Sequence, residues 1–162
     1  DLRRPRIHKV FGRSNDEGVT TLLLEPEGFN AAELETSIPN LSVLSSGPHA
    51  PNPAELVNSE RFASLFRSLT EHYDRIIIDS PPIAPVTDAA ILSTRVDATV
   101  LVVRASATSR DVARRAVRAL TDVGAPIAGA VLNAVHAEGR RAYYYYQYSY
   151  GYGENETPAT QT

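Results

Sequence analysis

Three short apolar runs along the chain have the pattern of buried β-strands. They cover residues 75–79, 98–103 and 127–132, and each is continuous in apolar residues instead of alternating with polar ones. Continuous runs of this length are typical of parallel sheets whose two faces are covered by helices. A weaker run at residues 41–45 predicts a fourth strand.

Apolar residues at helical spacing lie between these runs. One stripe covers residues 62–73, and either Asn58 or Ser59 is suited to cap the helix that it predicts. Shorter helices are predicted from Ala54 onward, after a turn-rich loop, and at residues 87–94.

A second long stripe covers residues 112–123, with Thr108 as the predicted N-cap. Gly124 and Pro126 follow it, and these residue types commonly end helices. The alternation of strands and helices predicts an α/β domain with a mostly parallel sheet flanked by helices.

The apolar pattern stops after Val135. We predict a folded portion over residues 1–135 and a flexible tail over residues 136–162. Seven of the eight tyrosines of the chain fall in this tail: Tyr143, Tyr144, Tyr145, Tyr146, Tyr148, Tyr150 and Tyr152. Such a cluster either accepts phosphate or is a low-complexity segment that stacks or aggregates without being modified.

Composition narrows the functional classes. The 162 residues carry a formal net charge of −3, which gives no electrostatic case for nucleic acid or anionic lipid as a partner. The absence of cysteine excludes disulfides and thiolate metal sites. No apolar run reaches the roughly 18 residues that cross a bilayer. The chain starts at Asp1 and not at methionine, so we interpret it as a fragment.

Lysine is almost absent from the chain. Fifteen of the sixteen basic residues are arginines, and Lys9 is the single lysine. A phosphate-binding loop of the form G-x-x-x-x-G-K-[ST] uses its lysine on the terminal phosphates of a nucleotide. Because Lys9 has no glycine before it and no Ser or Thr after it, the sequence contains no such loop.

Asp79 ends the first strand candidate and is followed by Ser80-Pro81-Pro82. Open α/β sheets bind ligands at the carboxyl ends of their strands, and a carboxylate there holds Mg²⁺ directly or through water. The two prolines direct the chain away from the sheet immediately after the acid. Asp79 is either such a metal ligand or an acid that ends a strand and caps the next turn.

The opening segment, residues 1–6, places an acid before three closely spaced arginines. This combination suits Mg²⁺ and phosphate together, since arginine binds phosphate oxygens in a bidentate fashion. A solvated basic turn has the same composition, and the segment alone leaves both interpretations open.

These motifs, in this order, resemble the bacterial tyrosine kinases of capsule and exopolysaccharide synthesis, which are relatives of the MinD and ParA ATPases. Residues 1–5 match the family's second acidic motif from its last acid, and residues 77–82 match its strand motif I-I-D-[ST]-P-P. The loop and helix start at residues 46–56 and the terminal tyrosines are also similar. The resemblance implies a P-loop NTPase type of fold that is incomplete at the N-terminus, where the P-loop is missing.

The resemblance also implies roles for single residues. Asp79 is expected to be the catalytic acid that organises Mg²⁺. Asp1 is expected to be the second catalytic acid, which assists the metal or receives the phenolic proton. Arg3 and Arg4 are expected near the phosphates or at a subunit contact, and Ser80 among the residues that bind the nucleotide.

Two further polar residues lie at the ends of predicted elements. Asn133 ends the last strand candidate and matches the position that touches adenine in related ATPases, or it simply turns the chain. For Asp88 we expect a role in capping the first turn of its helix, in preference to a role in catalysis. The tail tyrosines are the expected phosphate acceptors.

The resemblance therefore predicts an ATP-dependent protein-tyrosine autokinase that controls polysaccharide polymerisation and export, with ATP and Mg²⁺ as cofactors. Expected partners are neighbouring copies in a homo-oligomeric ring, a membrane-spanning activator and a tyrosine phosphatase, with no nucleic acid. The expected location is the cytoplasmic side of the inner or plasma membrane. Alternatives are a non-kinase ATPase switch of the MinD or ParA type and a catalytically dead interaction module.

The strands that the chain lacks are central in the family's sheet. We therefore expect this chain by itself to expose an unpaired edge and apolar surface. We also expect it to fold poorly alone and to bind ATP too weakly to be useful.

Overall fold

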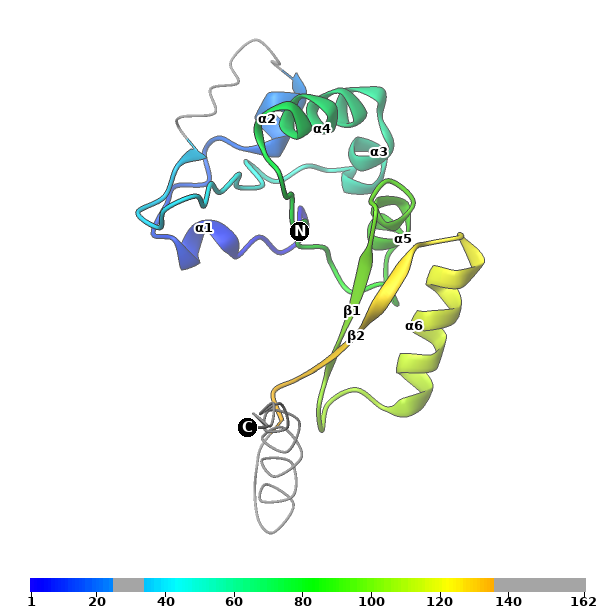
Figure 1. Ribbon diagram of the computed structural model, residues 1–162. Helices are drawn as coiled ribbons and strands as arrows, with labels where there is room; N and C mark the ends of the chain where they lie inside the picture. The colour runs from blue at the N-terminus through cyan, green and yellow to red at the C-terminus, as the bar shows by residue number, and fades with distance from the viewer. Residues whose placement is uncertain (25–33, 136–162) are drawn as a thin grey trace, which may run out of the picture.

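The computed structural model describes residues 1–24 and 34–135 (Figure 1). The predicted tail, residues 136–162, lies outside the described residues, and so do its tyrosines. Within the described ranges the elements follow in the order α1 (Ile7–Val10), α2 (Val19–Leu24), α3 (Pro53–Asn58), α4 (Glu60–His72), α5 (Asp88–Ser93), β1 (Thr99–Arg104), α6 (Arg110–Asp122) and β2 (Ile127–Asn133).

The strands β1 and β2 form a parallel pair that α6 connects. Their register places Val102 opposite Val131. Helix α6 lies beside the pair (Figure 1) and buries Ala116 and Leu120 on its inner side. Two of the predicted parallel strands are confirmed within one residue at each end, and so is the α/β class, a parallel sheet flanked by helices.

Residues 75–79 were expected to form a strand, but they pair with no other strand in the described part of the chain. The prediction is wrong for a physical reason. An apolar run supplies suitable side chains, but a strand exists only where a neighbouring backbone satisfies its N–H and C=O groups. Residues 41–45 also form no strand, only an isolated antiparallel bridge between Ser42 and Glu35.

Serine caps define the starts of the two long helices. Ser59 caps α4, because its Oγ accepts a hydrogen bond of 3.2 Å from the Phe62 N–H. Ser109 caps α6 and accepts from the Val112 N–H at 3.3 Å. The prediction of Thr108 as this cap is therefore wrong by one residue, since the cap must directly precede the first helical residue.

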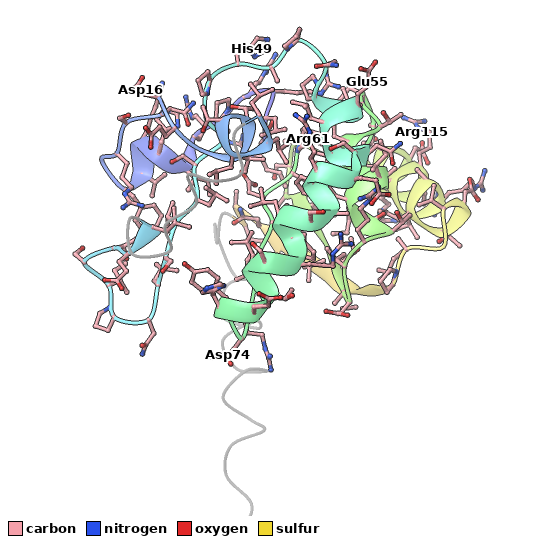
Figure 2. The ribbon with its side chains drawn as sticks, turned by 90° about the horizontal axis from the view of Figure 1, so that it is seen from above. Asp16, His49, Glu55, Arg61, Asp74 and Arg115 are labelled. Carbon is pink, nitrogen blue, oxygen red and sulfur yellow. The ribbon has the colours of Figure 1, made fainter. Side chains whose placement is uncertain are left out.

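The core joins four of the five helices that precede the sheet. Its buried cluster consists of Leu23, Val57, Phe62 and Leu92, from α2, α3, α4 and α5 in turn. Leu2 and Ile78 pack against this cluster, so the opening segment and the end of the run at residues 75–79 meet on the same core. Arg61 of α4, labelled in Figure 2, adds a polar link to α2. It donates a hydrogen bond of 3.1 Å to the Leu23 carbonyl.

Apolar side chains remain exposed on the sheet and near it. Every residue of β2 is exposed, Val102 of β1 is 61% exposed and Ile77 is 95% exposed. The expectation of an exposed apolar surface is thus confirmed for the described residues. Within these same residues, none of the helices combines the length and the apolar character needed to cross a membrane.

Candidate functional site

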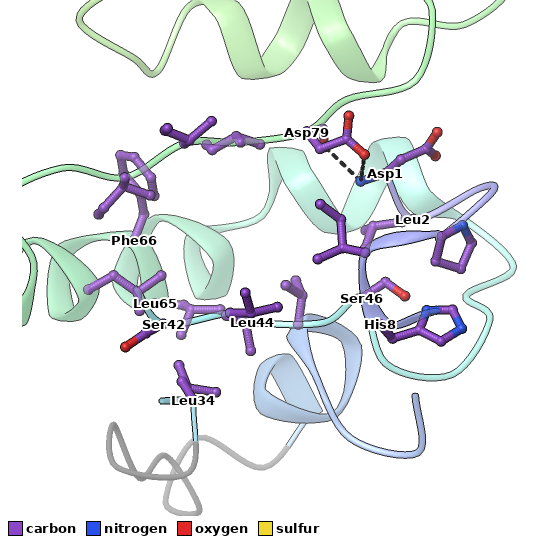
Figure 3. Close-up of a pocket in the computed structure, with 18 of the residues that line it drawn as sticks. Asp1, Leu2, His8, Leu34, Ser42, Leu44, Ser46, Leu65, Phe66 and Asp79 are labelled. Carbon is purple, nitrogen blue, oxygen red and sulfur yellow. Dashed lines mark hydrogen bonds and ion pairs between the residues drawn. The ribbon is translucent and has the colours of Figure 1, made fainter. Parts of the chain in front are cut away.

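The two predicted catalytic acids, Asp1 and Asp79, lie in contact although 78 positions separate them in sequence. The backbone nitrogen of Asp1 donates a hydrogen bond of 2.6 Å to the Asp79 carbonyl oxygen and lies 4.0 Å from Asp79 Oδ2 (Figure 3). The Asp79 side chain is 56% exposed. The structure thus joins the opening segment to the end of residues 75–79 and leaves an open carboxylate there.

The Asp1 carboxylate organises the turn that follows it. Its Oδ1 accepts hydrogen bonds from the backbone N–H of Arg3 at 2.8 Å and of Arg4 at 3.0 Å. Both bonds use the same oxygen, and in the described part of the chain Oδ2 makes none. The Arg4 side chain is exposed. One oxygen of Asp1 therefore remains available to a ligand.

Arg3 forms an ion pair with Asp88, the first residue of α5. Arg3 Nε lies 3.1 Å from Asp88 Oδ1 and 3.0 Å from Oδ2, and Arg3 Nη2 lies 2.9 Å from Oδ2. Asp88 is only 2% exposed. As expected, Asp88 is an acid in the first turn of α5. Its buried carboxylate, however, accepts hydrogen bonds from Arg3 and none from a backbone N–H of the described residues.

Ser80 and Asn133 make local contacts. Ser80 Oγ donates to the Pro81 carbonyl at 3.3 Å. Asn133 is the last residue of β2, as expected, and its Oδ1 accepts from the Ala134 N–H at 2.7 Å. Among the hydrogen bonds of the described residues, none joins either side chain to Asp1 or Asp79. Their predicted contacts with a nucleotide stay predictions.

A cavity of about 380 Å³ lies beside the acid pair. Residues 75–79 and residues 41–44 line it from two sides, with Leu65 and Phe66 of α4 between them (Figure 3). Most of the lining is apolar, and Asp1 and Asp79 are among the lining residues. Such walls suit a chain segment with apolar side chains better than a polyphosphate, whose charge requires cations and N–H donors.

The residues present fit a magnesium site of the kind that is shared with a substrate. Mg²⁺ is commonly held by one or two carboxylates together with phosphate oxygens and water. Asp79, with Asp1 next to it, meets that requirement. No group of three or more His, Asp or Glu side chains that could hold a metal occurs in residues 1–24 and 34–135. A lysine-bearing phosphate loop is absent from the sequence.

The chain is similar to proteins of known kind. It is 39% identical over 144 residues to CapB of Staphylococcus aureus, a match that covers 89% of this chain and 63% of CapB. It is 38% identical over 133 residues to the tyrosine-protein kinase YwqD of Bacillus subtilis, covering 82% of this chain and 56% of YwqD. The chain thus spans about three fifths of the length of these relatives. No protein-family model matches it.

Solved structures share the fold. The kinase domain of VpsO superimposes with a TM-score of 0.72 at 38% identity, over 84% of this chain and 68% of that chain. The kinase domain of Escherichia coli Etk gives 0.74 at 30% identity, over 86% and 55%. The parallel sheet, the covering helices and the acid pair define an α/β domain of the type that these structures contain. The chain belongs to the family of bacterial tyrosine kinases.

Proposed function

We propose that the protein to which this chain belongs is an ATP-dependent protein-tyrosine kinase that transfers the γ-phosphate of ATP to tyrosines of its own tail. The observation that carries the proposal is the contact between the backbone nitrogen of Asp1 and Asp79, which brings these two acidic residues to the same place. Phosphoryl transfer depends on positioning and on charge stabilisation, and a carboxylate pair that binds Mg²⁺ serves both. Membership of the tyrosine kinase family supports tyrosine as the acceptor.

The exposed carboxylate of Asp79 is proposed to hold Mg²⁺. Oδ2 of Asp1 is proposed to assist the metal or to receive the proton of the attacking phenol, because Oδ1 already accepts two N–H groups. Bound MgATP supplies the phosphoryl group. Arg4, with its exposed side chain, is proposed to contact phosphate or a neighbouring subunit. Ser80 and Asn133 are proposed contacts to the nucleotide.

The tail, residues 136–162, is proposed to present its tyrosines to a neighbouring subunit of a homo-oligomeric ring. A flexible link of about nine residues reaches roughly 15–18 Å, which favours delivery to the next subunit over return to the same site. Each phosphate adds about −1.5 to −2 charges, so full modification would drive the assembled tails apart. We expect the mass of the oligomer to fall after autophosphorylation, and an unchanged mass would contradict this part.

The remaining parts of the proposal concern context. They are a membrane-spanning activator, a tyrosine phosphatase that reverses the modification, and a location on the cytoplasmic side of the inner or plasma membrane. The process under control is proposed to be the polymerisation and export of capsule or exopolysaccharide. Family membership supports these parts, and residues 1–135 are proposed to act as the C-terminal portion of the kinase domain.

The decisive experiment uses the full-length protein with MgATP and maps phosphotyrosine by mass spectrometry. The Asp79→Asn variant removes the charge of the proposed metal ligand with little change in shape, and Asp111→Asn is the control, since Asp111 is exposed on α6. We expect labelling of the tail in the wild type and in Asp111→Asn, and a loss of at least about a hundredfold in Asp79→Asn. Equal labelling of all three would remove Asp79 from the mechanism.

A further inference from the structure

The contact between Arg3 and Asp88 joins two segments that the proposed mechanism does not otherwise connect. Arg3 uses Nε and Nη2 for three close contacts with the Asp88 carboxylate, between 2.9 and 3.1 Å. The carboxylate is nearly sealed from water, with 3% side-chain exposure, whereas the Arg3 side chain is 36% exposed. The acid therefore fixes the arginine, and the arginine is the only cation paired with it among the described residues.

Three consecutive residues of the opening segment are anchored at different places. The backbone nitrogen of Asp1 contacts the Asp79 carbonyl. Leu2 packs against the buried cluster. Arg3 binds Asp88. The Asp1 carboxylate also accepts the backbone N–H of Arg3, so the placement of Arg3 sets the turn in which Asp1 lies.

We propose that Asp88 is a positioning residue for tyrosine phosphorylation: through Arg3 it holds the turn that carries Asp1 in place beside Asp79. This inference rests on the proposed function. It also reassigns Arg3, which is the anchor of the opening segment and not a ligand of the phosphates. If Arg3 turned toward a phosphate, the buried Asp88 carboxylate would lose its cation, and that loss is unfavourable in a site without water.

Hydrogen exchange of the full-length protein, without nucleotide, tests the anchor directly. The backbone amides of Arg3 and Arg4 donate hydrogen bonds to Asp1 Oδ1. We expect both amides to exchange at least about tenfold faster in Asp88→Asn. The matched control is Asp111→Asn, which weakens an exposed ion pair of the same chemistry with Arg114 at 3.4 Å. Unchanged exchange in Asp88→Asn would overturn the inference.

Kinetics of tail phosphorylation separate positioning from phosphate binding. A displaced catalytic group lowers kcat by up to about a hundredfold and leaves the KM for ATP nearly unchanged. We expect this result for both Arg3→Gln and Asp88→Asn. An arginine that binds phosphate gives the opposite pattern, a raised KM in Arg3→Gln with a normal Asp88→Asn, and that pattern would overturn the inference.

Arg3→Lys keeps the test valid if the other variants unfold. Lysine retains the charge that neutralises Asp88, but it lacks the planar fork that fixes the geometry. We expect Arg3→Lys to unfold at the wild-type temperature while it shows faster exchange and a lower kcat. Wild-type exchange and kcat in Arg3→Lys would overturn the inference.

The two proposals fail in different ways. If the proposed kinase activity is wrong, the wild-type protein does not label tyrosine, while hydrogen exchange still reports the anchor. If only the positioning role is wrong, the wild type labels its tail and Asp79→Asn does not, while Asp88→Asn matches Asp111→Asn.

Discussion

At the scale of single residues, the buried carboxylate of Asp88 has the most demanding environment in the described chain. A charge removed from water is tolerated only where a cation and hydrogen bonds replace its hydration. Arg3 supplies both through Nε and Nη2. The Arg3 side chain is partly exposed, whereas the Asp88 carboxylate is buried. Removal of the arginine therefore leaves a buried carboxylate without its partner.

Arg3→Ala is therefore expected to lower the free energy of unfolding by about 2 kcal/mol, because it leaves a buried carboxylate without its partner. The comparison is Arg114→Ala, which breaks an ion pair between two exposed side chains and is expected to change stability by less than about 0.5 kcal/mol. Urea unfolding of the full-length protein measures both. Equal losses in the two variants would show that burial of Asp88 has no energetic consequence.

The acids Asp1 and Asp79 could be predicted as one site from the sequence, because each belongs to a motif and the order of the motifs is informative. The pairing of Arg3 with Asp88 could not. The two residues lie 85 positions apart, and the local rules of helix capping and charge spacing extend only a few positions. An acid at the first position of a predicted helix is expected to interact favourably with the helix dipole. Only the tertiary structure shows that the carboxylate of Asp88 is buried.

At the scale of elements, helices could be predicted well and isolated strands could not. The stripes at residues 62–73 and 112–123 correspond to α4 and α6, because a helix satisfies its own backbone hydrogen bonds. β1 and β2 were predictable because each has the other as a partner. Residues 75–79 have equally suitable side chains but no partner among the described residues, and this information is not contained in the run itself.

The caps give a test at the same scale. Ser109→Ala is expected to destabilise the protein by about 1 kcal/mol, because it leaves the Val112 N–H at the start of α6 without its acceptor. Thr108→Ala, one position earlier, is the matched control and is expected to change stability by a few tenths of that amount. Thermal unfolding of the two variants measures the difference. A larger loss of stability in Thr108→Ala than in Ser109→Ala would show that Thr108 is the cap, as the sequence predicted.

At the scale of the whole molecule, the described residues form a core that is open on one side. Leu23, Val57, Phe62 and Leu92 are sealed, while Ile77 and the strand β2 expose apolar surface. The cavity beside Asp79 continues this open side. The exposed apolar surface could be predicted from the sequence, because its resemblance to larger kinases implied that neighbouring strands are missing. The position of the cavity between residues 41–44 and 75–79 required the structure, because it depends on how two segments without regular structure lie relative to α4.

This open core and the missing phosphate loop together predict how the 162-residue chain behaves alone. We expect calorimetry to detect no binding of MgATP in the micromolar range, because the only lysine, Lys9, is in no glycine-rich loop and the cavity is mainly apolar. We expect the same chain to bind the dye ANS, which reports accessible apolar surface. The full-length protein serves as the control and is expected to bind MgATP and little dye. Micromolar binding of MgATP by the 162-residue chain would mean that Asp1, Asp79 and the arginines hold the nucleotide without a lysine-bearing loop. The expectation that such a loop is required for nucleotide binding would then be wrong.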